Sequence, residues 1–513
     1  MRCLYQCRVA TLSVALVLAA PVVDAQHALF PLDDIGYTYI DALQARGWLR
    51  DLPIVERPYA IGAIRAAVAA ARERQPRDGT SRWLNELFDA VNKYAPSASI
   101  TDTTVLFASL GAWGAAKTSQ TDDVIESVGR RSYLPGLTGR VLLQTPHISA
   151  VLRLGTPVRN DVGAATIAHR ARRFRAEDAY IDISSRFATL QIGRVGRSWA
   201  LPGQLGLTLS TAAAPYDQVY FRLGTPKVHL SSLFARLDDQ PVSFTSDTLA
   251  HRYVTAHRLS LRVGSFETAI NETVIYGGIG RGFSPALSNP AAALFLAQYS
   301  EGEKINPALG ADVLWHAPHG LLLGSQIFID DFQIDRCKYC GKPPGIGVTV
   351  TADGVLLPGS ARLFAAYTRV TTLTYRNTDR FEGYYSRGTS LGQRTIDFDE
   401  FRGGIDVGPV LRAPMRLYVA LRRQGAGSIF SPYPPLEAYN TWPTIFEGVT
   451  IKTVRVALSG ALRVASTLEV QGDVGMNRSR NDARILGATR TRLEGHLRAS
   501  FEPHWGRVRR RIE

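Results

Sequence analysis

Long apolar runs are missing from this 513-residue chain beyond its N-terminus. A helix that spans a bilayer needs about 20 consecutive apolar residues, so the sequence predicts no membrane-spanning helix. Cysteine is also scarce, with four in the whole chain, and Cys3 and Cys7 lie in the first ten residues. The remaining two, Cys337 and Cys340, exclude a fold held together by a framework of disulfides.

Common catalytic motifs are absent too: there is no Gly-x-Ser-x-Gly, no His-Glu-x-x-His and no phosphate loop. The glycine-rich stretch 277–282 lies between strand patterns and precedes no helix, which indicates a turn. We therefore expect no enzymatic activity, no cofactor, no metal and no nucleic-acid partner. A hydrolase whose active-site residues are dispersed along the chain remains an alternative.

Two groups of residues resemble a catalytic carboxylate pair and a zinc site, but the expected strand geometry argues against both. Asp330 and Asp331 are consecutive in a strand pattern and point to opposite faces, so we place them at a rim or on a bulge. His316, His319, Cys337 and Cys340 have a spacing that zinc accepts. A strand over residues 321–332 would separate the two pairs by about 40 Å, which argues against zinc.

The N-terminus has the features of a secretory signal peptide. Arg2 and Arg8 precede an apolar run over residues 9–20, and Val23-Asp24-Ala25 matches the small-residue cleavage pattern. We expect cleavage after Ala25, which assigns residues 1–25 to the signal peptide.

Residues 26–98 are predicted to form a small helical bundle. Asp33 and Asp34 can cap a first helix that Gly47 ends, an Ala-rich helix covers residues 59–74, and Thr80 or Ser81 starts a third. So few residues bury little core, so we expect the bundle to lean on a neighbour.

Residues 99–513 change to the two-residue period of strands. In Arg492–Phe501, apolar residues alternate with polar ones, and the same pattern recurs around residues 219, 419 and 456. A soluble sandwich also alternates, but export and the number of such strands favour an all-β transmembrane barrel. At roughly 22–25 residues per strand with its connection, this region allows about 16–18 antiparallel strands.

Positive charge is concentrated in the barrel region. Removing residues 1–25 lowers the net charge from +14 to +13, and residues 26–98 carry nine basic and nine acidic side chains. Charge facing lipid is costly, so these arginines belong in the lumen, at the rims or in loops. Rim arginines that meet anionic lipid headgroups are one interpretation. A basic lumen is the other, since Arg222, Arg422, Arg455, Arg492 and Arg498 lie on polar strand faces; Glu469, Asp473 and Glu494 are possible partners for some of them.

Several motifs, in order, resemble the capsule assembly protein Wzi family over most of the mature chain. They begin with the stretches 39–47, 52–53 and 57–59, and the strongest lies within 194–216, where the family's asparagine is replaced by Ala212 or Ala213. The matching residues there are Arg194, Trp199, Pro202, Gly203, Gly206, Leu209, Ser210, Ala214 and Pro215. Further matches are Glu272, Tyr276, Gly277, Gly278, Asn289, Pro290, Asn306, Asp312, Asp330, Asp331 and Phe332.

The resemblance implies an 18-stranded outer-membrane barrel of a Gram-negative bacterium, with the helical bundle at its periplasmic mouth. It also implies a lectin-like protein that binds capsular polysaccharide and helps to assemble or attach the capsule. Sugars stack on aromatic rings and bond to Arg and Gln, so Arg194, Arg197, Trp199 and Gln204 join the five polar-face arginines as candidate polysaccharide ligands. Alternatively, Trp199 belongs to the interfacial aromatic belt and its glycines form a turn.

The positive charge favours an acidic polysaccharide, because arginine donates paired hydrogen bonds to carboxylates. Outer-membrane lipid is the other expected partner. A porin-like channel for anionic solutes remains the main alternative function.

We predict that Cys337 and Cys340 form a short-loop disulfide in an extracellular loop, because an oxidising compartment favours it and a turn can bring their Cα atoms within about 4.4–6.8 Å. Free-thiol labelling of the intact, non-reduced protein should therefore fail. Strong labelling of both cysteines would reject the disulfide.

Overall fold

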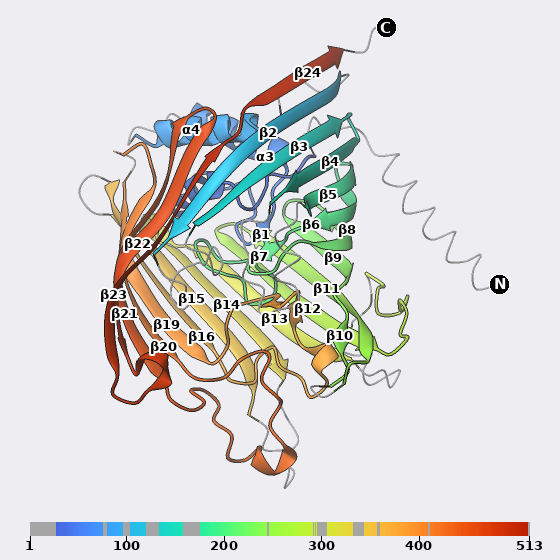
Figure 1. Cartoon of the computed structure of the whole chain (residues 1–513). Coiled ribbons are helices and arrows are strands. Elements are labelled where there is room, and N and C mark those ends of the chain that lie inside the picture. The colour runs from blue at the N-terminus through green and yellow to red at the C-terminus, as the bar shows by residue number, and fades with distance from the viewer. Residues whose placement is uncertain are drawn as a thin grey trace, which may run out of the picture.

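A large curved sheet and a group of helices make up the computed structural model (Figure 1), which describes residues 27–74, 79–95, 103–118, 133–156, 175–243, 246–290, 292, 294, 305–331, 343–356, 360–408 and 411–510. The α-helices of this part of the chain are α2 (Gly36–Ala45), α3 (Ile61–Glu73) and α4 (Thr80–Asn92). No helix among them has the length and apolar character to cross a membrane. Residues 1–26, which include the expected signal peptide 1–25, and the pair Cys337 and Cys340 lie outside the described residues.

The main sheet has 20 strands, of which 18 close the barrel. The barrel strands are β2 (Thr103–Lys117), β3 (Tyr133–Gln144), β4 (Ile148–Gly155), β5 (Arg175–Ser184), β6 (Ala188–Val195), β8 (Tyr216–Gly224), β9 (Val228–Arg236), β11 (Leu249–Val263), β12 (Phe266–Gly278), β13 (Asn306–His316), β14 (Leu322–Asp331), β15 (Gly345–Leu356), β16 (Arg362–Val370), β19 (Phe398–Val407), β20 (Met415–Gln424), β21 (Ile451–Ala465), β22 (Leu468–Arg480) and β23 (Thr489–Phe501). The other two are the short β10 (Gln240–Pro241) and β24 (His504–Arg510), which continues β23 along the edge of β2.

The barrel closes through β2, which has a partner on each side. Its residues 105–116 pair antiparallel with β3, and its residues 112–117 pair with β23. The predicted closed antiparallel barrel is confirmed, and its strand number falls at the upper end of the expected range. Closure leaves no sheet edge whose backbone groups would be unpaired in lipid.

Apolar and polar side chains separate on the two faces of the wall, as the sequence pattern predicts. On β21, Val454, Val456 and Leu458 are exposed on the outer face, whereas Arg455 is buried in the lumen. Outward residues of the neighbouring strands, such as Leu421 and Met476, continue the same apolar belt. The outer face is therefore built to contact lipid.

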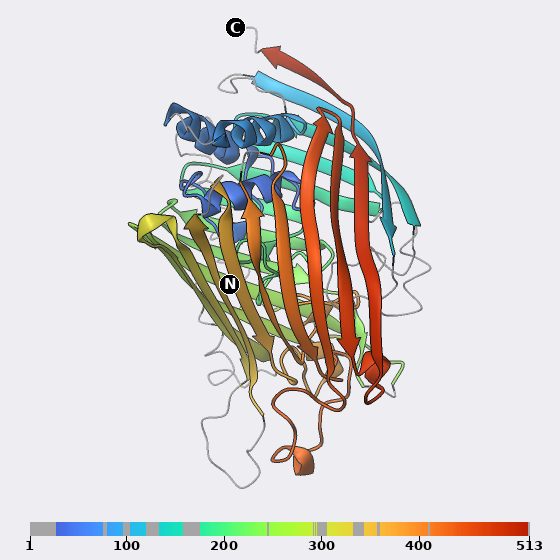
Figure 2. The same cartoon turned by 90° about the vertical axis from the view of Figure 1, so that its left-hand side faces the viewer.

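The two ends of the barrel differ in the length of their connections. Turns at one end are short, as at 145–147, 185–187, 225–227 and 264–265. The connections at the other end are long, as at 196–215, 371–397 and 425–450. In Figures 1 and 2 an orange part of the long connections projects below the barrel, and helices α3 and α4 lie at the opposite, short-turn end.

The helices form where their sequence signals place them. Asp34 Oδ1 accepts a hydrogen bond from Gly36 N (2.7 Å) and so caps the first turn of α2. Gly47, at φ 76°, follows the end of that helix. Helices α2 and α3 both pack on α4, which buries Trp83, Leu84 and Leu87.

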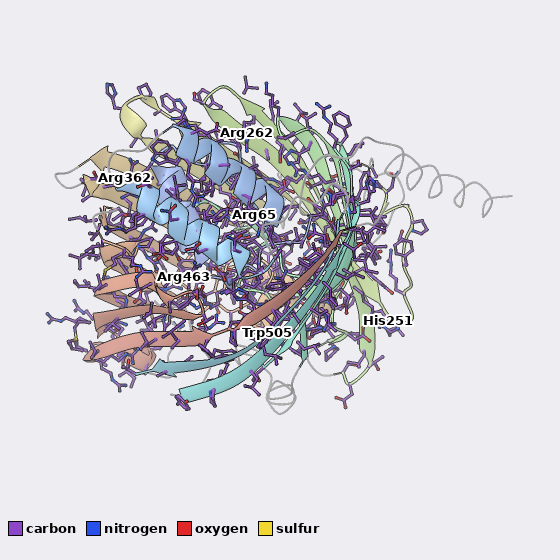
Figure 3. The ribbon with its side chains drawn as sticks, turned by 90° about the horizontal axis from the view of Figure 1, so that it is seen from above. Arg65, His251, Arg262, Arg362, Arg463 and Trp505 are labelled. Carbon is purple, nitrogen blue, oxygen red and sulfur yellow. The ribbon has the colours of Figure 1, made fainter. Side chains whose placement is uncertain are left out.

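The helical segment shares a hydrophobic core with the barrel wall, as its small size led us to expect. Its buried residues form one cluster with inward residues of β2 to β6, among them Phe107, Leu142 and Tyr180. Ion pairs add to this contact: Arg46 binds Asp406 (3.1 Å) and Arg412 binds Glu86 (2.6 Å). Seen from the short-turn end, the helices lie across the barrel mouth (Figure 3).

Long connections also fold into the lumen rather than away from it. Strand β7 (Ser198–Trp199) pairs inside the barrel with β1 (Glu56–Arg57). Tyr375 Oη and Tyr384 Oη then donate hydrogen bonds to the carbonyls of Leu207 (2.5 Å) and Thr208 (3.0 Å). Segments 199–209 and 370–398 thereby form one buried apolar cluster with inward residues of β9 to β14.

The structure supports the geometric predictions for the possible chemical sites. Residues 318–320 form a tight turn before β14. Strand β14 ends at Asp331 with a register shift between Ile329 and Asp331, which is the expected rim and bulge. Asp330 is buried and accepts a hydrogen bond from Tyr375 N (2.5 Å), so it helps to hold an inner segment.

Asp397 joins two of the long connections. Its carboxylate is fully buried and accepts hydrogen bonds from Thr372 Oγ1 (2.8 Å), Gly427 N (2.9 Å), Glu447 N (3.0 Å) and Phe446 N. These donors come from connections 371–397 and 425–450, so one side chain holds the two segments together.

Replacing Asp397 with Ala should loosen these connections, because each buried donor left without an acceptor costs about 1–3 kcal/mol. Limited proteolysis of the folded barrel should show faster cleavage within 425–450. Asp217→Ala is the matched control, since that carboxylate is 64% exposed at the same end of the barrel. Equal cleavage rates in the two variants would contradict the role of Asp397.

Candidate functional site

A lumenal cavity of about 350 Å³ lies between the N-terminal segment and one side of the barrel wall. Residues 29–41 form one side, the inward faces of β3 to β6 form the other, and residues 211–215 with Arg387 and Thr389 complete it. This volume is at the lower end of the range for small-molecule sites, about 300–1,000 Å³.

An ion-paired group spans the cavity. Arg153 on β4 binds Asp33 (2.7 Å) from the N-terminal segment and Asp178 (2.8 Å) from β5. Arg498 on β23 lies 3.7 Å from the same Asp33 carboxylate. Burial alone would raise the pKa of Asp33, but Arg153 and Arg498 hold it below its usual range. This group is therefore charged and mutually compensated.

Positive charge is less balanced where the cavity meets the long connections. Arg175, at the start of β5, binds Glu177 (2.7 Å). Arg387 donates to the Pro215 carbonyl (3.4 Å), and burial together with the charges of Arg194 and Arg175 lowers its pKa. Arg175 and Arg194 are themselves paired with Glu177 and Asp217, whereas the guanidinium of Arg387 lines the cavity and can donate to an anion there.

The rest of the cavity lining is uncharged and mixed in character. Tyr37 and Tyr180 contribute rings, Thr38 and Thr389 contribute hydroxyls, and residues 212–215 supply a small apolar surface. A sugar has polar hydroxyls and apolar ring faces, so this combination suits a saccharide. Guanidinium groups beside it suit a saccharide that carries a carboxylate.

The structure brings few of the sequence-predicted ligands to this cavity. Arg498 lines it. Arg194 is on the outer face of the wall, bound to Asp217 (2.5 Å), and acts on the cavity only through its charge. Gln204 is half-buried in the turn after Leu201, to whose carbonyl its backbone N–H donates (3.0 Å).

Trp199 and Arg197 are buried inside the barrel. Trp199 is 1% exposed within the apolar cluster, so the interfacial-belt alternative is wrong for it. Arg197 lies over the Tyr220 ring (3.4 Å to its centre) and donates to Gln218 (2.6 Å). The glycine part of that alternative is confirmed, because Gly203 has a φ of 69° in a turn.

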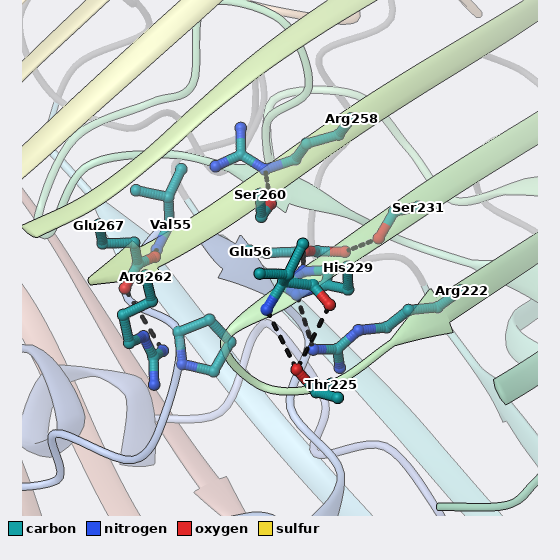
Figure 4. Close-up of polar contacts among 12 residues, drawn as sticks. Val55, Glu56, Arg222, Thr225, His229, Ser231, Arg258, Ser260, Arg262 and Glu267 are labelled. Carbon is teal, nitrogen blue, oxygen red and sulfur yellow. Dashed lines mark hydrogen bonds and ion pairs between the residues drawn. The ribbon is translucent and has the colours of Figure 1, made fainter. Parts of the chain in front are cut away.

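Arg222 belongs to a network that fixes β1 to the wall (Figure 4). Arg222 is 3.2 Å from His229 Nδ1, and His229 Nε2 is 2.7 Å from Glu56. A guanidinium can only donate, so Nδ1 is the acceptor and Nε2 carries the hydrogen that bonds to Glu56. Burial alone would raise the pKa of Glu56, but His229 and the nearby arginines hold it well below its usual range.

The same network contains a serine, a histidine and a glutamate, yet it lacks the order of a catalytic triad. Ser231 Oγ donates to Glu56 (2.6 Å) and His229 bonds to the same carboxylate (2.7 Å). A nucleophilic serine requires the histidine as its hydrogen-bond acceptor. This group therefore has a structural geometry.

Arg422, Arg455 and Arg492 point into the lumen but are engaged by acidic neighbours. Arg422 binds Glu400 (3.2 Å), while Arg455 pairs with Asp473 and Arg492 with Glu494. Arg455 is fully buried and also donates to Asn477 (2.7 Å). The alternative that some arginines pair with wall carboxylates describes Arg455 and Arg492, whose removal would leave acids unpaired.

Arg153, Arg175 and Arg387 were not selected from the sequence. Arg175 points inward because the pairing of β4 and β5 shifts register beside Arg153. Arg387 lies in a long connection whose course no periodicity reveals. Arg153 could have been predicted from the sequence. It lies on the same face of β4 as Val151 and Gly155, and this two-residue period is the pattern by which the other arginines were selected.

Among residues that the structure describes, no group of three or more His, Cys, Asp or Glu side chains is placed to hold a metal ion.

Comparison with known proteins identifies the fold. No family model matches the sequence, and no curated protein matches it. Among solved structures, the chain is similar to Wzi, an outer-membrane protein involved in group 1 capsule assembly in Escherichia coli and a carbohydrate-binding β-barrel. The TM-score is 0.63 at 13% identity, covering 93% of this chain and 99% of Wzi. OprD of Pseudomonas aeruginosa gives a TM-score of 0.43 at 9% identity, covering 81% of this chain and 98% of OprD. The chain therefore has a Wzi-like outer-membrane β-barrel fold over almost its whole length.

Proposed function

We propose that this protein is a non-enzymatic outer-membrane barrel that binds an acidic surface or capsular polysaccharide and assists capsule assembly or attachment. The cavity beside Arg175 and Arg387 carries the proposal, because it combines guanidinium groups with tyrosine rings and hydroxyls. The carbohydrate binding of Wzi, whose fold the chain shares over 93% of its length, supports the same function.

The contents of the lumen favour a binding protein over a porin-like channel. The helical segment fills the part of the lumen beside β2 to β6, and the inner connections fill the part beside β9 to β14. Buried apolar side chains occupy the lumen in both parts, which disfavours the passage of an anion there.

The asymmetry of the two ends supports the orientation. Outer-membrane barrels have short periplasmic turns and longer extracellular loops. The helices contact the short-turn end, where Trp83 Nε1 of α4 donates to the Leu411 carbonyl between β19 and β20 (3.0 Å). In this proposal the helices of residues 26–98 lie at the periplasmic mouth, with the segment around Glu56 inside the lumen, and the long connections emerge on the side where a capsule lies.

Exchanging Arg175 and Arg387 for Gln should weaken binding of an acidic polysaccharide at least about tenfold, because two charge-assisted hydrogen-bond donors of roughly 1.5–3 kcal/mol each are lost. Binding of the purified protein to an acidic and a neutral polysaccharide would be measured by calorimetry. The native protein should prefer the acidic one, and its affinity should fall with salt as the Debye length shortens.

Arg236→Gln is the matched control, since its side chain is 59% exposed outside the cavity and is ion-paired with Asp239. It should bind as the native protein does. Binding that ignores salt and both cavity substitutions would refute the acidic-saccharide site.

The intact protein should show near-zero conductance in a planar bilayer, because buried clusters fill the lumen beside β2 to β6 and beside β9 to β14. Deleting residues 27–96 should raise the conductance by opening the lumen beside β2 to β6, while heat-resistant migration in electrophoresis shows that the barrel persists. A large stable conductance of the intact protein would instead support the channel. Unchanged conductance of a folded deletion variant would show that the helices do not plug it.

A further inference from the structure

A row of cations crosses the outer face of the barrel near its long-loop end. The residues lie directly opposite one another on five neighbouring strands: Arg369 on β16, Asp399 on β19, Arg423 on β20, Lys452 on β21 and Arg480 on β22. Arg478 lies two residues before Arg480 on the same face of β22. The cluster defined by these six residues is called the outer basic row.

Alternation along the strands places this row outside the lumen. Thr453 and Asn477, the neighbours of Lys452 and Arg478, are buried on the inner face. Val454 and Met476, the next outward residues toward the middle of the barrel, are 45% and 48% exposed. The cations therefore face the same side as the apolar belt.

Charge in the outer basic row is not balanced by the protein. Asp399 forms an ion pair with Arg423. Within the described part of the chain, no ion pair involves Lys452, Arg478 or Arg480, and all three are exposed. Opposite residues of an antiparallel pair have Cβ atoms only about 4.5–5.5 Å apart, where like charges destabilise the sheet. Arg423, Lys452 and Arg480 are in this position, so an external anion would relieve their repulsion.

The position of the row along the barrel axis indicates which anion it meets. The next row toward the barrel middle contains Tyr367 and Phe401, exposed rings that pair across β16 and β19. Such rings mark the boundary between hydrocarbon and headgroups in membrane barrels. Apolar residues Leu421 and Val454 continue that row. The cations hence lie at headgroup level, on the side where the long connections emerge.

We propose that the outer basic row is a binding site for the phosphate groups of an outer-leaflet lipid, with the apolar belt below it contacting the acyl chains. Arginine binds phosphate through paired hydrogen bonds, and lysine adds a point charge. This site is separate from the lumenal cavity and does not depend on the saccharide function.

The test compares two double variants of the full-length protein, each losing one lysine and one arginine. Lys452→Gln with Arg480→Gln removes two members of the row. Arg186→Gln with Lys227→Gln removes two exposed cations from short turns at the opposite end. Native mass spectrometry would measure binding of bisphosphorylated lipid A, and of the same lipid without phosphates, to each protein in detergent.

The row variant should bind the phosphorylated lipid about 30-fold more weakly than the native protein, from roughly 1 kcal/mol for each basic residue. The control variant should bind as the native protein does, and the lipid without phosphates should bind weakly to all three. Equal affinity of the two double variants, or equal binding of both lipids, would overturn the site. Inorganic phosphate that binds with the same dependence on Lys452 and Arg480 would assign the row to a soluble anion and overturn the lipid proposal.

Should the row variant fail to fold, Asp399→Asn provides the opposite change. It removes the acid of the row and should tighten binding of the phosphorylated lipid several-fold. Unchanged or weaker binding by this folded variant would contradict the proposal.

Discussion

Closure of the sheet through β2 is the constraint on which the rest of this structure depends. A strand in hydrocarbon must have hydrogen-bond partners on both sides, and β2 has β3 on one side and β23 with β24 on the other. Once the ring is closed, the alternation of each strand is fixed. Residues such as Val456 must face lipid, while neighbours such as Arg455 must face the lumen.

That alternation forces a large number of charges into a confined space, and most of them are neutralised there. Arg455 pairs with Asp473 on the adjacent strand, and Arg258 on β11 pairs with Asp312 on β13, across β12, at 2.6 Å. A lumenal arginine is thus no indication of a ligand by itself. More informative is an arginine such as Arg387, which lines a cavity and donates to a backbone carbonyl there.

Much of the fold followed from local patterns, whereas most of the cavity did not. Two-residue alternation predicted the barrel strands, and Asp34 and Gly47 marked the ends of α2. The inward direction of the polar-face arginines was also predicted correctly, but their partners could not be predicted. Arg222, for example, contacts His229, which binds Glu56 from a distant part of the sequence. Trp199 was misplaced for a similar reason: its connection turns into the barrel, and no periodicity reports the path of a loop.

The pairing of β1 with β7 also constrains how the protein can be assembled. Glu56 lies before every barrel strand in the chain, yet it is bound inside the ring to residues of β8 and β9. The strand that seals the ring, β2, comes later in the sequence than this inner segment. Biogenesis must therefore either wrap the wall around an N-terminal segment that is already in place or draw that segment in through an open mouth. In both routes the interior is assembled from the start of the chain, while the final joint combines its first strand with its last.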